Sequence, residues 1–289
     1  MRLLCFALLL LSASLSAQSF SGGFRAGLNF VTFDGDQEMS AAGNETYETF
    51  NRTTGFHVGA TFALAFTDLV GIKADLMYSQ KGGERRIEGP SYFYLYVDQD
   101  DRVGELIFGD VTAEIDVVNS YIDVPVTAYY RLGPLELEGG ASVGFLVNSR
   151  ASGGLTYSNT PFGADEEITF NVEGSYFSDE PAGAGILSRA DTPLPRTNVL
   201  PPDVVSVYYN SDSDESVYRR FDFGLVAGLS FYLDNGLFLG ARYQHGLTDV
   251  SKGDNDLRIT RADDLTGRSF NADDKDYTRS YQVSVGFRF

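Results

Sequence analysis

The sequence has few of the residues on which covalent, redox or nucleic-acid chemistry depends. It has one cysteine, two histidines and no tryptophan among its 289 residues. It carries 22 basic against 40 acidic residues, a formal net charge of −18. This acidity argues against nucleic acid as a partner, because proteins that bind it present a basic surface. No run of about 18 apolar residues follows the N-terminal segment, which excludes a helical membrane protein.

The abundant residues favour strands and turns. Hydrophobic residues make up 43% of the chain and charged residues 21%, so the chain is not expected to be disordered. There are 31 glycines, 22 phenylalanines and 17 tyrosines, and this combination is more typical of strands and turns than of long helices. The length fits two average domains, but all-β barrels reach this size as one domain. One domain is expected.

The first 17 residues have the pattern of a secretory signal peptide. Arg2 precedes nine apolar residues, and small residues follow as far as Ala17. Cleavage after Ala17 is expected, with a cut one or two residues away as an alternative, and a buried N-terminal helix is the other interpretation. Cys5 is removed with this segment, so the mature domain, residues 18–289, is expected to have no disulfide and no thiol chemistry.

Eight later segments alternate apolar and polar residues with a period of two, which predicts β-strands. They are residues 24–30, 55–66, 70–79, 121–131, 135–148, 221–231, 237–244 and 281–289. One face of each segment is almost purely apolar, and the other is small, glycine-rich or charged. This matches a lipid-facing exterior around a polar interior. A secreted β-sandwich is the alternative, because soluble half-buried sheets also alternate.

Short and long connections follow one another along the chain. The short ones are 67–68, 132–134 and 234–236, and the long ones are about 34–52, 82–119, 150–217 and 249–276. Asn235-Gly236 is a strong hairpin signal. The pattern predicts an all-β fold, an eight-stranded antiparallel transmembrane β-barrel of the cell outer membrane, with short periplasmic turns and long extracellular loops.

The barrel must close on itself. An open sheet edge in hydrocarbon leaves backbone groups without partners, at several kcal/mol each. The last strand is therefore expected to pair with the first. Tyr281, Phe287 and Phe289 lie on one face of that last strand and are the candidate closure and assembly residues.

Several strand motifs resemble the PorT-like outer-membrane β-barrel family (porin family) of Bacteroidota, which are Gram-negative. The residues that carry the resemblance are 121–126 (YIDVPV), 129–131 (YYR), 26–29 (AGLN), 221–224 (FDFG) and 240–243 (GARY). The resemblance covers the strands from Phe20 to Phe289 but not the long loops. The resemblance implies an eight-stranded outer-membrane barrel. The C-terminal Phe289 is similar to the signal that the barrel assembly machinery reads in such proteins. A minority of members serve a secretion apparatus. That role is not assigned to this chain, because it would lie in the large third loop, which does not match the family.

The inward face of the predicted barrel is charged. An eight-stranded barrel is only just wide enough for side chains to fill. The inward charged residues are Arg25, Lys73, Asp75, Asp123, Arg131, Glu136, Glu138, Asp222, Arg242 and Arg288. Five acids face five bases, which predicts a structural network of ion pairs because buried charges need partners. A narrow gated pore is the alternative. Pro125 has no N–H to donate and predicts a bulge or irregularity in the fourth strand.

Nothing in the sequence points to catalysis or to a resident cofactor or metal. His57 falls on the inward face and His245 on the outward register, and neither has a local arrangement of nucleophile and base. The long loops carry acidic clusters such as Asp98-Gln99-Asp100-Asp101, without EF-hand spacing. Solvated surface charge is the simplest interpretation, and Ca²⁺ bridging the loops to lipopolysaccharide is the alternative.

The long loops are where a specific function is expected. Residues 92–97 and 105–108 are strand-like, so strands three and four are expected to extend above the membrane, while the proline-containing third loop is either disordered or a small cap.

We expect a non-enzymatic barrel that displays acidic extracellular loops in an envelope-structural or partner-binding role. A narrow channel for small solutes or ligands and a component of a secretion complex are the alternatives. Expected partners are outer-membrane lipid and lipopolysaccharide, the barrel assembly machinery and a protein contacted by the loops. The barrel is expected to be a monomer.

Overall fold

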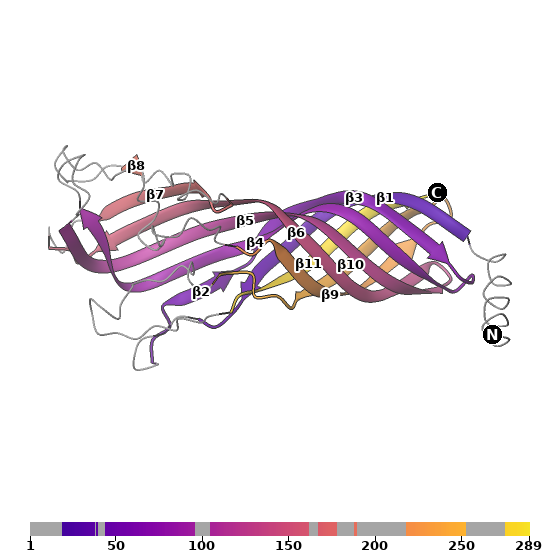
Figure 1. Cartoon of the computed structure of the whole chain (residues 1–289), viewed down its shortest axis with the longest axis horizontal. Helices are drawn as coiled ribbons and strands as arrows, with labels where there is room; N and C mark the ends of the chain where they lie inside the picture. The colour runs from indigo at the N-terminus through magenta and orange to yellow at the C-terminus, as the bar shows by residue number, and fades with distance from the viewer. Residues whose placement is uncertain are drawn as a thin grey trace, which may run out of the picture.

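The structure is a computed structural model, and it describes residues 19–37, 39, 44–95, 105–161, 167–177, 188–189, 218–252 and 275–289. The regular structure of these ranges is all β-strand (Figure 1). Within them no helix is long and apolar enough to cross a membrane. The predicted signal peptide, residues 1–17, lies outside the described part of the chain.

Eight strands form a closed antiparallel ring. In ring order they are β1 (Ser19–Asp34), β3 (Thr53–Ala65), β4 (Val70–Leu95), β5 (Glu105–Leu132), β6 (Leu135–Ser158), β9 (Phe221–Tyr232), β10 (Leu237–Gly246) and β11 (Tyr277–Arg288). Each pairs with the next, and β11 returns to β1. The predicted eight-stranded antiparallel barrel is therefore confirmed.

The closing seam joins the two ends of the barrel domain. The β1–β11 register runs from Gly23 opposite Arg288 to Asp34 opposite Tyr277. Gly22 and Phe289 exchange backbone hydrogen bonds, with N–O distances of 3.2 and 2.9 Å. No backbone group along this seam is left to face hydrocarbon, which is what closure requires.

Tight turns connect the ring at three predicted positions: between β3 and β4, between β5 and β6, and between β9 and β10. In the last of these, Gly236 has φ +88°, a conformation that favours glycine, and the Asn235 side-chain oxygen accepts a hydrogen bond of 3.1 Å from the Leu237 amide. The Arg288 amide donates to the Gly236 carbonyl at 2.9 Å, so this turn lies at the same end of the barrel as the C-terminus.

Three strands continue far beyond the ring at the other end (Figure 1). β4, β5 and β6 have 26, 28 and 24 residues. Three short strands complete this extension: β2 (Glu48–Asn51) pairs with β4, β7 (Ile168–Ser175) with β6, and β8 (Ser188–Arg189) with β7. Within the connection 82–119, β4 runs to Leu95 and β5 begins at Glu105, so these two strands extend beyond the ring, as the strand-like segments 92–97 and 105–108 predicted. Likewise β6 and β7 occupy part of the predicted loop 150–217.

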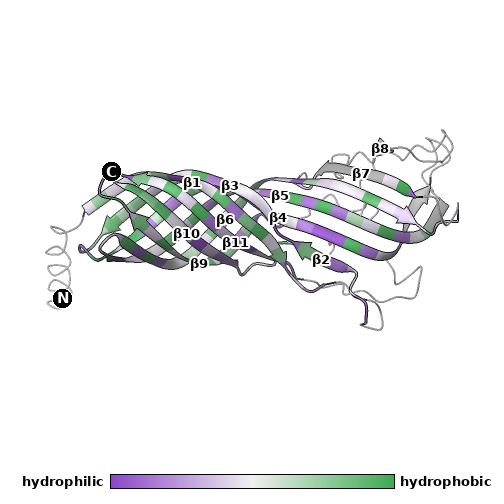
Figure 2. Cartoon of the chain, turned by 180° about the vertical axis from the view of Figure 1, so that it is seen from behind, coloured by the Kyte–Doolittle hydropathy of each residue, from purple (hydrophilic) through white to green (hydrophobic). Residues whose placement is uncertain are grey.

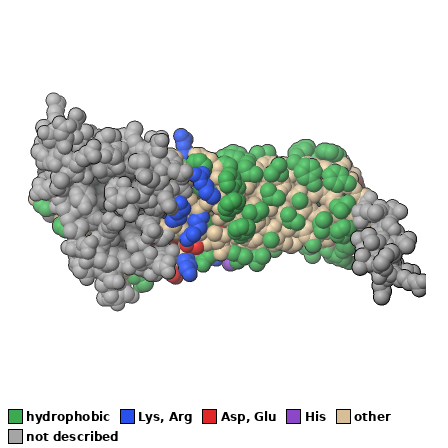
Figure 3. All heavy atoms as spheres, viewed as in Figure 1, with side chains coloured by type: hydrophobic (Ala, Val, Ile, Leu, Met, Phe, Trp, Pro, Cys, Tyr) green, Lys and Arg blue, Asp and Glu red, His purple; other side chains and the backbone are tan. Residues whose placement is uncertain are grey.

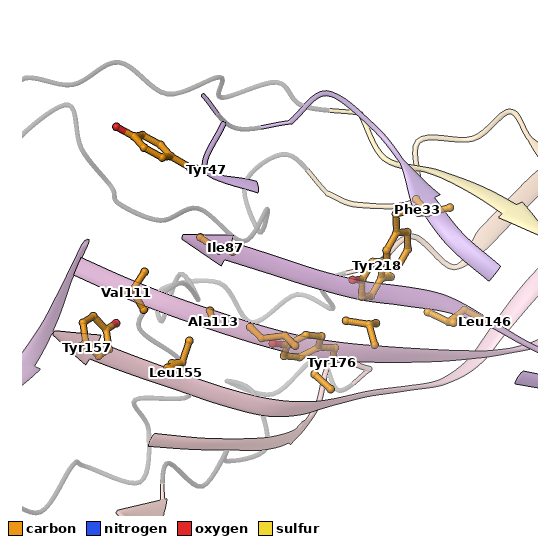
Figure 4. Close-up of a cluster of buried hydrophobic side chains, with 14 of the residues drawn as sticks. Phe33, Tyr47, Ile87, Val111, Ala113, Leu146, Leu155, Tyr157, Tyr176 and Tyr218 are labelled. Atoms are coloured by element: carbon orange, nitrogen blue, oxygen red, sulfur yellow. The ribbon is translucent and has the colours of Figure 1, made fainter. Parts of the chain in front are cut away.

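Hydrophobic and hydrophilic residues alternate along the strands (Figure 2), and burial shows that the polarity of the two faces of the sheet inverts where it leaves the ring. In the barrel, apolar side chains face outward and charged ones inward. In the extension, the inward side chains are mainly apolar, with Arg85 and Glu48 as a buried charged exception, and Ile87, Ala113, Ile115 and Leu155 are fully buried. They belong to one cluster with aromatic residues such as Tyr218, which stacks on Phe33 at a centroid distance of 5.9 Å (Figure 4). This apolar core explains why the strands continue outside the barrel: it supplies the packing that a bare hairpin lacks.

A register shift between Ser120 and Tyr121 on β5 helps to produce this inversion. Tyr121 pairs with Leu146 on β6, whereas Ser120 pairs with Asn148, so Val147 is the extra residue of a β-bulge. The bulge exchanges the two faces of β6 and turns Ala151, Leu155 and Tyr157 inward.

Pro125 does not itself carry the bulge. The β4–β5 pairing is interrupted beside it, between Ala74 opposite Val126 and Met77 opposite Asp123, but the register is the same on both sides. The missing N–H therefore removes local pairing without adding a residue. The irregularity predicted in this strand is present, and its register shift lies further along, at Ser120/Tyr121.

Candidate functional site

The interior of the ring is the candidate site. The structure brings the ten charged residues predicted to face inward into the barrel interior, from strands on all sides of the ring. Eight of the ten are under 8% exposed. Arg131 and Arg288 keep side-chain exposures of 27% and 17% and lie toward the end that carries the tight turns.

Arg242 on β10 links carboxylates from two strands, β4 and β6, that flank β5. Its Nη1 donates to Asp75 Oδ2 on β4 at 2.5 Å, and its Nη2 donates to Glu138 Oε2 on β6 at 3.0 Å. Its Nε also donates to Glu138. Arg25 on β1 donates to the same Asp75 oxygen at 3.1 Å, and Thr61 on β3 donates to the other. Two cations thus share one buried carboxylate.

Lys73 continues the network toward the turn end. Its Nζ lies 2.5 Å from Glu136 Oε1 and 2.7 Å from Glu138 Oε2. Glu136 Oε2 in turn accepts hydrogen bonds from Arg131 at 2.9 Å and from Arg288 at 3.2 Å. The result is an unbroken series of ion pairs across the barrel, in which every carboxylate meets at least two cations. Such pairing is what buried charges require to offset desolvation.

A second cluster lies nearer the extension. Lys81 donates to Asp222 at 3.0 Å and to Asp123 at 3.4 Å, and Thr278 donates to Asp222 at 3.1 Å. The Lys81 ammonium lies 4.9 Å from the ring centroid of Tyr121. Lys81 was missed from the sequence because the third strand was ended at Ser79. Continuing the alternation of Lys73, Asp75 and Ser79 by one step would have found it.

A third cluster of ion-paired side chains lies beyond Lys81, further toward the extension. Arg85 Nε donates to Glu48 at 2.7 Å, and its Nη1 lies 3.6 Å from Asp276 Oδ2. All three side chains are buried. No alternation or motif in the sequence indicated this group, because Glu48 reaches it only through the pairing of the short strand β2 with β4.

The two histidines occupy different environments. His57 is buried, with Nδ1 2.7 Å from the side-chain oxygen of Asn29 and Nε2 2.9 Å from Ser284 Oγ. His245 is half-buried on the outward side, 3.4 Å from the Tyr243 hydroxyl. His57 on β3 is therefore linked by hydrogen bonds to β1 and β11. In the described ranges no three His, Cys, Asp or Glu residues are grouped to hold a metal ion.

Of the candidate closure residues, Tyr281 and Phe287 lie on the outward face of β11, and Phe289 directly follows that strand. Tyr281 and Phe289 are exposed, and Phe287 is half-buried. Phe287 stacks on Phe24 of β1 across the closing seam, with ring centroids 6.1 Å apart. These contacts place Phe287 on the seam, and its role in assembly, like that of Tyr281 and Phe289, stays a prediction.

Outside the membrane-spanning part, one acidic pair is opposed in the sheet. Asp116 on β5 lies opposite Glu84 on β4 in the extension. Partial burial, followed by the charge of Glu84, raises the pKa of Asp116 above its ordinary value. Two residues further along, Arg86 donates to Glu114 at 2.7 Å and to Glu88 at 2.8 Å.

A closed ring of eight strands with an apolar exterior and a charged, ion-paired interior defines a transmembrane β-barrel. Outward residues such as Leu28, Val58 and Leu225 are 48–52% exposed to their surroundings, as a lipid-facing wall requires. Residues 16–252 match the family described as outer membrane protein beta-barrel domain, and the chain belongs to that family. The protein is therefore an outer-membrane β-barrel.

Several solved structures resemble the chain at low sequence identity. Ail of Yersinia pestis, solved in complex with the heparin analogue sucrose octasulfate, is 12% identical, with 94% of this chain and 99% of that chain covered and a TM-score of 0.34. OprG of Pseudomonas aeruginosa is 10% identical (94% and 97% covered, TM-score 0.35). Neisserial surface protein A is 11% identical (94% and 99% covered, TM-score 0.31). No curated protein matches.

Proposed function

We propose that this protein is a non-enzymatic outer-membrane barrel with a sealed interior, which anchors and displays an extracellular β-sheet for envelope integrity or partner contact. The observation that carries the proposal is the unbroken ion-pair series Arg25–Asp75–Arg242–Glu138–Lys73–Glu136 across the barrel. It joins strands β1, β4, β10 and β6, so it fills the interior of a barrel that is already narrow.

The sealed interior favours an anchor over a channel for small solutes. A permeating solute would have to displace side chains of which all but Arg25 are held by two or more charged partners, and separating a buried ion pair costs several kcal/mol. An interior lined by apolar side chains would have favoured a channel for hydrophobic ligands, and the described interior is charged.

The displayed part is the extension of β4, β5 and β6. Its apolar inner core makes it a folded surface, and its outer face carries charged and polar side chains such as Arg86, Glu88, Thr112 and Glu114. A protein partner would meet this face and the acidic loops. The same proposal includes insertion of the barrel into the outer membrane by the assembly machinery, which would recognise Phe289.

A narrower family assignment is part of the proposal. The PorT-like resemblance is supported by the motif 121–131, whose Tyr121 and Asp123 face the interior beside Lys81. A component of a secretion complex remains the alternative within that family. Co-purification of other envelope proteins with the tagged barrel from its native membrane would favour that alternative.

Cysteine labelling of intact cells tests the display. In a Cys5→Ser background, Thr112→Cys places a thiol on the outer face of the extension and Asn235→Cys places one in the β9–β10 turn. A membrane-impermeant maleimide is expected to label the Thr112 variant in intact cells, and the Asn235 variant only after the outer membrane is opened. Labelling of the Asn235 variant alone in intact cells would contradict the orientation.

A further inference from the structure

The outer end of the apolar wall is marked by paired aromatic side chains. The pairs are Phe56–Tyr78, Phe145–Phe221 and Tyr243–Tyr281, with ring centroids 5.6, 5.3 and 4.9 Å apart. Aromatic rings of this kind lie at the headgroup level of transmembrane barrels. The side chains one step beyond them are therefore at the level of lipid phosphates and sugars.

Arginines occupy that next step on two sides of the barrel, one around β1 and one at the β6–β9 pair. Arg52 lies four residues before Phe56, Arg219 two before Phe221, Arg279 two before Tyr281, and Arg150 five after Phe145 across the β-bulge. Figure 3 shows the basic side chains gathered in a band at this end of the apolar wall. We call these four residues the arginine girdle. A basic band is unexpected by chance on a chain with a net charge of −18.

Only part of the girdle is neutralised by the protein. Arg279 pairs with Asp34 at 2.8 Å, and Arg219 with Asp249 at 3.2 Å. Within the described ranges, no carboxylate lies within ion-pair distance of Arg52 or Arg150, and both side chains are exposed.

The geometry of Arg52 suits an anion approaching from the lipid side. Its guanidinium lies 5.2 Å from the ring centroid of Tyr281, across β1 from its own strand. The ring holds the guanidinium against the barrel wall while leaving its N–H donors free for another partner. A guanidinium binds phosphate through two parallel hydrogen bonds, which an ammonium cannot do.

We propose that the arginine girdle binds the phosphate groups of lipid A, the anchor of lipopolysaccharide in the outer leaflet, with Arg52 and Arg150 as its principal contacts. The inference rests on the proposed orientation, in which the extension is extracellular. Direct contact is favoured over divalent-cation bridging, because Asp34 and Asp249 at this level are already paired with arginines.

Lipid A titration tests the girdle on the folded full-length mature barrel in detergent, with binding followed by native mass spectrometry in EDTA. The wild type is expected to bind bisphosphorylated lipid A more tightly than phosphate-free lipid A. The double variant Arg52→Gln/Arg150→Gln is expected to lose about fivefold in affinity for each arginine, about 25-fold in all. Arg86→Gln, which removes an exposed arginine further out on the extension, is the matched control and is expected to bind as the wild type.

Two outcomes would overturn the proposal: equal affinity of the wild type for phosphate-free lipid A, or an unchanged affinity of the double variant. Loss of wild-type binding in EDTA would also overturn direct contact, because it would show that divalent cations bridge the protein to the lipid A phosphates. Should the double variant not fold, Arg52→Lys/Arg150→Lys keeps the charge and is expected to bind several-fold more weakly than the wild type. Labelling at Thr112 does not depend on these variants, so a failure of lipid binding is distinguishable from a failure of the display function.

Discussion

At the scale of single residues, the interior depends on groups that each serve two partners. Glu138 accepts from both Arg242 and Lys73, and Asp75 accepts from both Arg242 and Arg25. Removing one such group takes a carboxylate partner from two buried cations at once. The cost of that change is larger than the net contribution of the intact pair.

Glu138→Ala is therefore expected to lower the free energy of unfolding by about 3–5 kcal/mol. The control is Leu239→Ala, because Leu239 faces lipid and is 60% exposed. The chain has no tryptophan, so unfolding is best followed by far-UV circular dichroism and by the mobility of unboiled samples on gels. Equal unfolding midpoints for the two variants would count against a paired interior.

Asp116 gives the extension a pH dependence of its own. Its pKa is raised in the folded state, so the folded protein holds a proton that the unfolded chain releases. Stability therefore falls as pH rises through the window just above the ordinary carboxyl pKa. Asp116→Asn removes the repulsion from Glu84 and is expected to stabilise the extension by about 0.2–1 kcal/mol at neutral pH.

Hydrogen exchange of the β4 and β5 amides at pH 4 and pH 7 measures this effect. Exchange in the wild type, corrected for its intrinsic pH dependence, is expected to show less protection at pH 7 than at pH 4. The Asn variant is expected to remove that difference. A variant that is less protected at pH 7 would mean that the Asp116 carboxylate stabilises the sheet.

Residue-level prediction worked where one physical rule was sufficient. Strict alternation identified Arg25, Lys73 and Arg242 as inward-facing, because a strand in a membrane barrel has only two faces. It did not identify the partners of Arg85, since Glu48 and Asp276 come from segments without alternation.

At the scale of elements, the main finding is the inversion of polarity along β4, β5 and β6. The same inward register carries Lys73 and Asp75 inside the barrel and Ile87 beyond it. The strand pattern predicted each spanning segment and the tight turns, but it ended each strand where the apolar face changed sides. A strand that leaves the membrane keeps its backbone pairing, but its outward face then meets water in place of lipid. A rule that looks for one continuous apolar face therefore ends the strand too early.

Gly82 lies where β4 passes from the barrel to the extension. It has φ +141°, and a Cβ built on it would overlap the carbonyl oxygen of Val117 on β5. Gly82→Ala is expected to disrupt the β4–β5 pairing there and to destabilise the extension by about 1–3 kcal/mol. The ring below it is expected to remain closed.

Two readouts separate these parts. Amides 83–91 and 109–117 are expected to exchange faster in the Gly82 variant, while the mobility shift between boiled and unboiled samples is retained. Gly139→Ala is the control, because its Cβ would meet only one atom, 3.9 Å away. Unchanged protection in the Gly82 variant would show that the two strands adjust without loss of pairing.

At the scale of the whole molecule, one chain combines two folded regions with opposite polarity. The barrel buries charge and exposes apolar surface, whereas the extension buries apolar surface and exposes charge. The arginine girdle lies at the junction. In the proposed function, the barrel is a sealed anchor that holds the extension at a fixed level above the lipid.

Conductance of the refolded mature protein in a planar lipid bilayer tests the sealed interior most directly. Folding is first verified by the gel mobility shift of the unboiled sample. The account predicts no steady single-channel conductance for the wild type, because the ion pairs around Arg242 and Glu138 occupy the interior. Steady, discrete conductance from the folded wild type would contradict it and would make the protein a channel.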